Sequence, residues 1–519
     1  MADASRPTPP RTVRPAHGPV GRRAPGGRAR RRAVLVAVAL LALVAGILVG
    51  RTTASSGPDR ADAGSTLAVT LRDPTGSGAL QPAPGEPLRD RTELAGTGAP
   101  PRPGRTLGVI AQLTDTHVRD TASPARIPFL DRLGTPFTAV FRPQEPLTLQ
   151  TLAAATRTVN ALRPDLTLVT GDLTDNSQEN ELDAAIGALR GGTVRPFDAR
   201  SLQGADNADP FFYRPDVDPP RRPGLLDRAR APFRAPGLRG PVAVLPGNHD
   251  VLVGGEVRAT PGLRATAVGA ERLVTPDGSF ARSVPREQAA AQESVNRLLA
   301  AGDLPGTTAP VRPDPRRRLL SGEQVVARLA RAGLAGERAG RADAVRDVGT
   351  GVRVVLLDDV PRGGSDTGAV DAAQLAFLDR ALTTGGDRWI LVAVHAPLQR
   401  TPQGRAIRDR LARAPRVLAT VGGDTHHDRV RPVRTAAGGY WSITTSALAD
   451  WPQQGRALRV RATAGGGALL ETHKLDTAPD GLADTARELA YLDAQGGRPD
   501  GNAGTPDDRN VRLYRAPPR

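Results

Sequence analysis

Residues 166–176 read LTLVTGDLTDN, an apolar run that ends abruptly in polar residues. The first five residues combine leucine with β-branched side chains, and a run this short favours a buried strand over a helix. Gly171 ends the run, and two carboxylates and an amide follow it. The stretch therefore predicts an internal strand whose carboxyl end carries potential ligand groups.

The same pattern recurs along the chain. Apolar runs that predict further strands occupy Leu107–Leu113, Val242–Leu245, Val352–Leu357, Trp389–Val394 and Val417–Val421. Apolar residues at helical spacing predict helices over Leu149–Leu162 and Asp371–Leu382. Strands that alternate with helices predict an α/β architecture.

Two stretches interrupt this alternation. Residues 191–240 are rich in Pro, Arg and Asp, and residues 251–350 are rich in Ala and Arg with helical patches near 286–301 and 321–333. We interpret both as insertions into one domain that spans residues 105–475. Residues 51–104 predict a Pro/Gly-rich linker with one short strand at Thr66–Leu71. Residues 476–519 predict a helix at Leu482–Leu492 followed by a tail.

The N-terminal region has the pattern of an export segment. Residues 33–50 are uncharged and apolar, and Arg30, Arg31 and Arg32 precede them. As a helix they span roughly 27 Å, just short of a bilayer core. A cleaved signal peptide and a retained transmembrane signal-anchor both fit, and a buried core helix is the alternative. Residues 1–32 predict a disordered basic cytoplasmic segment, which places the rest of the chain outside the cytoplasm, secreted or membrane-anchored.

Charge and cysteine content exclude several classes of protein. The net charge is +16, but residues 1–50 hold nine arginines and one acid, so half of it lies in the leader. A basic composition confined to an export signal gives no reason to expect specific nucleic-acid binding. The absence of cysteine excludes disulfides, thiolate metal sites and cysteine nucleophiles.

Polar clusters follow five of the six predicted strands. They are Thr114-Asp-Thr-His117, Gly171-Asp-Leu-Thr-Asp-Asn176, Pro246-Gly-Asn-His-Asp250, His395-Ala-Pro397 and Gly422-Gly-Asp-Thr-His-His427. Ligand sites of open α/β sheets gather beyond the carboxyl ends of strands, so these segments can converge on one site. A single buried histidine is most often a hydrogen-bonded core residue. Four of the seven histidines follow predicted strands, however, and with Asp and Asn they suit a pair of divalent metals.

The ordered motifs D-x-H, G-D, G-N-H-D, a lone histidine and G-x-x-H resemble those of the calcineurin-like metallophosphoesterase family. The resemblance covers residues 107–450. It implies a four-layer α/β/β/α sandwich, here with two long insertions, and a dinuclear metal centre at one edge. The leader, the inserts and residues 439–454 resemble an exported actinobacterial branch of that family.

The resemblance also implies roles for single residues. The implied ligands are Asp115, His117 and His426 at the first metal, Asn248, His395 and Asp424 at the second, and Asp172 between the two. His249 is implied as the acid that protonates the leaving group or stabilises the phosphoryl oxygens. Asp250 is implied as the partner that orients His249.

Two positions depart from patterns found in the family. The last motif is usually G-H-x-H, whereas this chain has Asp424 in place of the first histidine. Asp424 either binds the second metal, which favours Mn, Mg or Fe over Zn, or leaves that metal weak or absent. His427 is a displaced ligand or a neighbouring substrate or structural residue. Asp175 stands where purple acid phosphatases place a tyrosine ligand, so that subfamily is excluded.

The sequence thus predicts an exported metallophosphoesterase with two divalent ions, drawn from Mn, Fe, Zn and Mg. A water activated by both metals would hydrolyse a phosphoester substrate, either a monoester or a diester. The membrane is a further partner if the N-terminal segment stays uncleaved. The alternatives are a cyclic-nucleotide-type phosphodiesterase or nuclease, and a non-catalytic metal-binding or wall-associated scaffold.

Overall fold

The computed structural model describes residues 64–96, 98–126, 142–198, 222–283, 285, 288–302, 306–360, 362, 370–399, 404–493 and 501–518. The chain forms two compact units, Met1–Asp59 and Arg60–Arg519, and all described residues belong to the second. The predicted leader, residues 1–50, lies outside the described residues. Within the described ranges, no helix combines the length and apolarity needed to span a membrane.

One sheet has seven strands in the order β3-β19-β18-β17-β4-β5-β8. Its strands are β3 (Arg89–Leu94), β4 (Pro103–Leu113), β5 (Leu166–Thr170), β8 (Val242–Leu245), β17 (Gln454–Thr463), β18 (Ala468–Asp476) and β19 (Val511–Arg515). Strands β4, β5 and β8 are parallel, and β17 pairs antiparallel with β4. The three parallel strands therefore end at the same edge.

The second sheet has six strands in the order β11-β12-β13-β14-β16-β15. Its strands are β11 (Ala344–Val348), β12 (Val352–Leu356), β13 (Trp389–Ala393), β14 (Val417–Gly422), β15 (Arg429–Val433) and β16 (Tyr440–Thr444). The four central strands are parallel, and β11 and β15 pair antiparallel at the two edges.

Alternation along the strands explains how these sheets stack, because successive side chains point to opposite faces. Leu168 and Leu391 belong to the core between the two sheets. The next residues, Val169 and Val392, belong to outer cores beneath helices. A strand buried on both faces needs a continuous apolar run, which is what these sequences supply.

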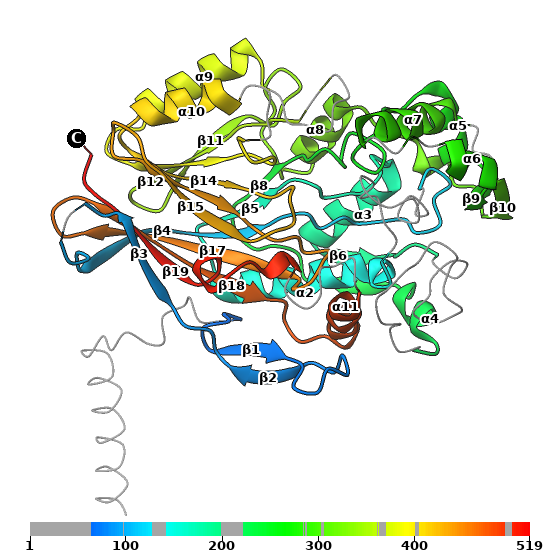
Figure 1. The fold of residues 1–519 in the computed structure, drawn as a ribbon, viewed down its shortest axis with the longest axis horizontal. Helices are drawn as coiled ribbons and strands as arrows, with labels where there is room; N and C mark the ends of the chain where they lie inside the picture. Colours follow the sequence, from blue (N-terminus) through cyan, green and yellow to red (C-terminus); the bar gives the residue numbers. More distant parts are fainter. Residues whose placement is uncertain are drawn as a thin grey trace, which may run out of the picture. The chain divides into compact units, whose positions relative to one another are not determined.

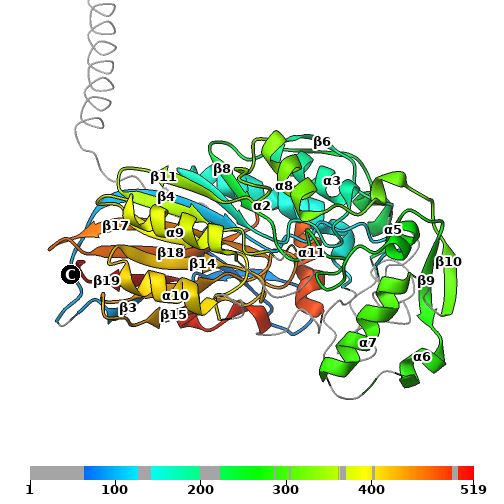
Figure 2. The same cartoon turned by 90° about the horizontal axis from the view of Figure 1, so that it is seen from above.

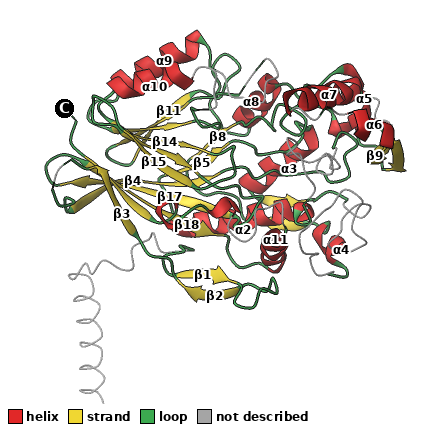
Figure 3. Ribbon diagram, in the orientation of Figure 1, coloured by secondary structure: helices red, strands yellow, loops and turns green. Residues whose placement is uncertain are grey.

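Helices cover both outer faces. On the seven-stranded sheet the outer core includes residues of α2 (Thr148–Leu162) and α3 (Glu179–Arg190). On the six-stranded sheet it includes residues of α9 (Ala372–Thr383) and α10 (Gly404–Arg413). Figure 1 shows α9 and α10 along the upper side of the six-stranded sheet, away from α2 and α3, and Figure 3 shows the same elements by secondary structure. The predicted four-layer α/β/β/α sandwich is confirmed.

Two segments contribute more than the sequence predicted. The stretch taken as a linker contains β1 (Val69–Arg72), which pairs with β2 (Gln81–Pro84), and β3, which is part of the large sheet. The stretch taken as a tail contains β19, which lies between β3 and β18 after helix α11 (Gly481–Leu492). The expected boundaries at 105 and 475 are therefore too narrow. Alternation of Val511 and Leu513 into the inter-sheet core was the signal for β19.

The two interrupting stretches contain short elements. Within 191–240, β6 (Gly192–Val194) pairs with β7 (Phe233–Ala235), and α4 (Leu225–Ala229) lies between them in sequence. Within 251–350 lie α5 (Pro261–Ala267), β9 (Glu271–Pro276), α6 (Gly278–Ser283), α7 (Gln288–Ala301), β10 (Gly306–Pro310) and α8 (Gly322–Arg331). Figure 2 shows α5, α6, α7, β9 and β10 gathered at one end of this unit. Short 3-10 turns occupy Glu145–Leu147, Pro315–Arg317, Gly501–Ala503 and Pro506–Asp508.

Candidate metal centre

Loops at the ends of five parallel strands carry the predicted ligands. Strands β4, β5 and β8 lead to Asp115 and His117, to Asp172, and to Asn248; strands β13 and β14 lead to His395, and to Asp424 and His426. Gln112 connects the two sheets directly beneath these loops. Its amide nitrogen donates to the Gly422 carbonyl at 3.0 Å and to the Thr170 hydroxyl at 2.9 Å.

Several residues of these loops have a left-handed backbone conformation, with positive φ. Nine non-glycine residues of the described ranges have positive φ, and five of them are predicted ligands. These five are Asp115, His117, Asp172, Asp424 and His426, with φ between 42° and 68°. Left-handed backbone at such residues costs about 1 kcal/mol or more each and concentrates at functional sites, where surrounding structure maintains it.

Four predicted ligands form the first cluster. One ligand atom each from Asp115, His117, Asp172 and His426 lies within 4.8 Å of the others. The Nε2 atom of His117 is 3.7 Å from Asp172 Oδ2 and 3.0 Å from the Nε2 atom of His426. The Nε2 atom of His426 is 3.9 Å from Asp115 Oδ1. Two imidazoles and two carboxylates thus converge on one point.

The second cluster is built around His395. Its Nε2 atom is 2.9 Å from Asn248 Oδ1, 3.4 Å from Asp172 Oδ1 and 3.8 Å from Asp424 Oδ1. Asp172 therefore presents Oδ2 to the first cluster and Oδ1 to the second. The two oxygens of one carboxylate therefore face two separate groups of predicted ligands.

The other ring nitrogen of each ligand histidine is anchored. The Nδ1 atom of His117 is 3.1 Å from Asp175 Oδ1, that of His395 is 2.8 Å from the Thr170 carbonyl, and that of His426 contacts Asp450. A metal-binding histidine characteristically donates its second N–H in this way, which fixes the ring and leaves the other nitrogen for the metal. All three Nε2 atoms face the clusters.

The donor set fits divalent cations in two further respects. The Oδ2 atom of Asp115 is buried and has no hydrogen-bond partner among the described residues. A buried carboxylate oxygen without a partner is costly unless a cation satisfies it. In addition, a Cβ atom added to Gly247 would lie 2.1 Å from Asp172 Oδ1, so only glycine allows this close approach.

Burial and neighbouring charges set the protonation of the centre. Burial raises the pKa of Asp115 to about 6. Burial, with the nearby His249, lowers the pKa of His117 to about 3, so its ring is neutral at neutral pH, as a ligand must be. Burial disfavours the charged form of Asp172, but the charges of His395 and His249 outweigh it and hold the pKa of that carboxyl well below its usual range.

The predicted acid, His249, lies beside the first cluster. Its ring packs edge-on against His117 with the centroids 4.5 Å apart. Burial disfavours its charged form, yet the carboxylates of Asp172 and Asp175 raise its pKa to about 9. Its side chain is 19% exposed, against 3% for His117. His249 is therefore protonated at neutral pH and lies on the open side of the centre.

The partner of His249 differs from the prediction. We expected Asp250 to orient the ring, but the Nδ1 atom of His249 is 3.2 Å from both the carbonyl oxygen and Oδ1 of Asp175. Asp250 instead accepts hydrogen bonds from the backbone N–H groups of Leu173, Thr174 and Gly247. Its carboxylate thus links the loop after β5 to the loop after β8 through backbone hydrogen bonds. The imidazole ring of His249 is oriented by Asp175 instead.

Sequence reasoning missed two residues that hold the ligand histidines. The Oδ1 atom of Asp175 contacts the Nδ1 atoms of both His117 and His249, and the same carboxylate forms an ion pair with Arg119. Asp450 receives His426 and pairs with Arg142 at 2.6 Å. Asp175 has a local signal, because it lies three residues after Asp172 in the same loop. Asp450 has none, since it is 24 residues from His426. His427 is exposed, with its ring at the Thr425 carbonyl.

Comparisons with known proteins give remote likenesses only. No family model matches the chain, and no curated protein matches it. A dimetal phosphatase from Danio rerio is 12% identical over 72% of this chain and 100% of its own, with a TM-score of 0.35. The sulfate thiohydrolase SoxB of Thermus thermophilus is 15% identical over 77% of this chain and 62% of its own, with a TM-score of 0.29.

Fold and site together define the class of this protein: a four-layer α/β/β/α sandwich with a candidate two-metal centre at the carboxyl ends of its parallel strands. Any statement about its chemistry therefore rests on the side chains of this candidate centre.

Proposed function

We propose that this protein is a metallophosphoesterase, which hydrolyses phosphoester bonds with the help of two divalent ions. One observation carries the proposal. Three histidines direct Nε2 atoms toward the carboxylates of one buried centre, and a carboxylate or carbonyl oxygen contacts the Nδ1 atom of each. A structural core histidine needs no such convergence, whereas a pair of metal ions does.

The residues divide between two ions. Asp115, His117 and His426 would hold the first, Asn248, His395 and Asp424 the second, and Asp172 both. When bound there, two divalent ions would supply an activated water and positive charge to balance the negative charge that develops on phosphoryl oxygens. Three carboxylates and an amide oxygen favour Mn, Mg or Fe over Zn. The backbone N–H of Asp424 donates to Asp115 Oδ1 at 3.0 Å, and its own Oδ1 atom is 3.8 Å from the Nε2 atom of His395, which supports a role for Asp424 at the second ion.

Protein side chains supply the remaining chemistry. His249 is protonated at neutral pH and would donate a proton to the oxygen of the leaving group, while Asp175 holds its ring. The side chains of His249 and His426 are 19% and 18% exposed, whereas His117 and His395 are nearly enclosed. The phosphoester would therefore approach from the side of His249 and His426.

Export belongs to the same proposal. The apolar run at residues 33–50 behind three arginines supports a location outside the cytoplasm, secreted or anchored in the membrane. A substrate would then be an extracytoplasmic phosphomonoester or phosphodiester. A reporter enzyme fused after residue 60 tests this topology, because it should be active only outside the cytoplasm.

Turnover with defined metals tests the catalytic part. The chain from residue 52, loaded with Mn, Fe, Zn or Mg, should hydrolyse generic monoester or diester substrates. His249→Ala should retain the metals and lose turnover, and Asp172→Asn should lose both. His427→Ala is the matched control, since this exposed neighbour of His426 should behave as wild type. No turnover with any metal, combined with no bound metal by elemental analysis, would rule the proposal out.

A further inference from the structure

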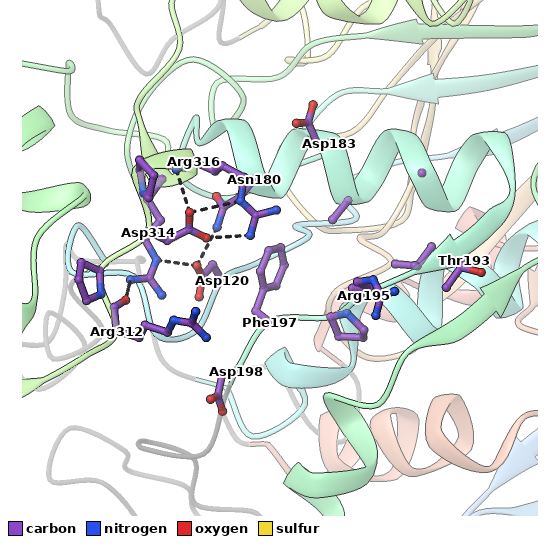
Figure 4. Close-up of a pocket in the computed structure, with 17 residues that line it drawn as sticks. Asp120, Asn180, Asp183, Thr193, Arg195, Phe197, Asp198, Arg312, Asp314 and Arg316 are labelled. Atoms are coloured by element: carbon purple, nitrogen blue, oxygen red, sulfur yellow. Dashed lines mark hydrogen bonds and ion pairs between the residues drawn. The ribbon is translucent and has the colours of Figure 1, made fainter.

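A cavity in the same unit includes none of the predicted metal ligands. Its volume is about 580 Å³, within the range of small-molecule sites. One face of α3 forms its first wall, with Asn180, Asp183, Ala184 and Gly187 at helical spacing. The segments 193–198 and 312–317 form the other walls, and Asp120 also lines it. Figure 4 shows these side chains around the cavity.

Cations without partners distinguish this cavity. Four aspartates line it, and each already has an interaction partner. Three of them pair with arginines: Asp120 with Arg317, Asp314 with Arg316 and Asp183 with Arg328. The fourth, Asp198, also makes an interaction. The guanidinium groups of Arg195 and Arg312 are exposed and make no hydrogen bond or ion pair within the described residues. Two positive charges therefore remain available to a ligand.

Apolar surface lies between these cations. The view in Figure 4 draws the ring of Phe197 between Arg195 and Arg312. Phe197 is partly buried against the outer core, so its position is fixed by packing. Ala184 and Gly187 have small side chains or none, so the α3 side of the cavity leaves space for a ligand. A Cβ atom added to Gly187 would have one neighbour within 4 Å, the Cγ2 atom of Val194 at 4.0 Å.

We propose that this cavity binds an organic phosphate. The phosphate group would pair with one of the two guanidinium groups, Arg195 or Arg312, which Figure 4 shows on opposite sides of Phe197, because a guanidinium binds phosphate oxygens through two parallel hydrogen bonds. A planar or apolar body would pack on Phe197 and on the helix wall formed by Ala184 and Gly187. A free inorganic anion would use the cations alone and leave the apolar surface uncovered.

The site is distinct from the metal centre but connected to it. Asp120 accepts from Arg317 and Asn180 in the cavity, while its backbone N–H donates to Glu181 at 2.8 Å. Glu181 in turn accepts from the backbone N–H of Asp175 at 3.2 Å. The proposal does not depend on the phosphoesterase activity, since binding can be measured without turnover.

Calorimetry on the full chain in detergent micelles tests the proposal. The probe is phenylphosphonate, whose carbon–phosphorus bond is not a substrate bond for an esterase. It should bind, and affinity should fall with rising ionic strength. Methylphosphonate, which lacks the ring, and benzyl alcohol, which lacks the anion, should each bind at least about tenfold more weakly. Equal binding of methylphosphonate would mean an inorganic-type anion site and would overturn the assignment.

Variants locate the binding. The double variant Arg195→Gln, Arg312→Gln should lose about tenfold or more in affinity for phenylphosphonate. Gly187→Leu should weaken binding as much by filling the cavity, and replacing a helix glycine should not destabilise the fold. Arg239→Gln, at an exposed arginine outside the cavity, should bind as wild type.

The metal centre is the competing location for the probe. His249→Ala should leave the affinity unchanged, because His249 is not part of the cavity. Binding that is lost in His249→Ala and kept in the double arginine variant would place the probe at the metal centre and overturn the proposal. No binding of phenylphosphonate at millimolar concentration would overturn it as well.

Discussion

The carboxylate of Asp175 is the position where a single atomic change should reveal most about the centre. Its Oδ1 atom lies 3.1 Å from the Nδ1 atom of His117, a predicted ligand, and 3.2 Å from that of His249, the predicted acid. Asp175→Asn preserves the shape of the side chain but removes its charge. The NH2 group of the asparagine amide is a donor, so it cannot accept a hydrogen bond from an imidazole N–H.

The size of the effect follows from these contacts. Residues that hold a ligand or a catalytic histidine typically affect metal affinity or activity by about 10–100-fold. Such a loss corresponds to about 1.4–2.8 kcal/mol, the scale of one charge-assisted hydrogen bond. Without the Asp175 charge the pKa of His249, now raised to about 9, should also fall toward its ordinary value. The variant should therefore lose turnover about 10–100-fold.

Two ester substrates separate the functions of Asp175. A p-nitrophenyl ester releases a stable anion and needs little proton donation, whereas an alkyl ester needs the proton from His249. Asp175→Asn should slow the alkyl ester more, and elemental analysis reports any metal loss separately. Asp379→Asn on the exposed face of α9, which also removes one carboxylate from an arginine, is the matched control. Equal rates for wild type and Asp175→Asn on the alkyl ester would refute the reasoning.

Three further predictions follow from burial and charge. Leu168→Ala in the core between the sheets should lower the free energy of unfolding by about 2–5 kcal/mol in urea titration, and an unchanged midpoint would contradict that packing. Burial lowers the pKa of Lys474 to about 7; its 2.7 Å contact with Asp428 opposes this shift, and the positive charges of Arg456 and Arg509 reinforce it. The unfolded chain then binds a proton that the folded chain lacks, so Lys474 contributes stability that rises from pH 7 toward 10.5, opposite in sign to the contribution of His249 up to pH about 9; the difference in free energy of unfolding between wild type and Lys474→Met should shift in favour of wild type over this range, and parallel pH profiles would disprove it. Chelation of the metals should lower the melting temperature and Mn²⁺ should restore it, whereas Asp172→Asn should respond to neither; a chelator-insensitive wild type would count against a metal centre.

Much of the fold could be predicted from local patterns. The strand predicted at Leu166–Thr170 has these bounds in β5, and the helix predicted at Leu149–Leu162 differs from α2 by one residue at its start. A short continuous apolar run signals the strand and apolar residues at helical spacing signal the helix, so both depend on residues close together in the chain. Strand β3 was missed because its residues, Arg89–Leu94, are mostly charged and exposed. An edge strand of this kind is held by pairing with β19, and pairing leaves no local pattern.

For the candidate site, the positions of the ligand residues could be predicted from the sequence, but their hydrogen-bond partners could not. The nine candidate residues lie in loops directly after predicted strands, so their proximity followed from the shared edge of parallel strands. The partners of these residues could not be predicted. Asp250 follows His249 in sequence, but the backbone turns its carboxylate toward the N–H groups of the neighbouring loop. Adjacent side chains in a turn point in different directions, so sequence neighbours are poor guides to contacts.

The sequence by itself determined which strands are buried on both faces, where they end, and which ligand groups follow each end, because these properties depend on residues close together in the chain. Only the tertiary structure decided that Asp175 and Asp450 hold the histidines, that β19 enters the large sheet, and that α3, residues 193–198 and residues 312–317 enclose a cavity with two arginines that make no ion pair within the described part of the chain. Each of those features joins groups distant in sequence, and their contact depends on how whole layers pack.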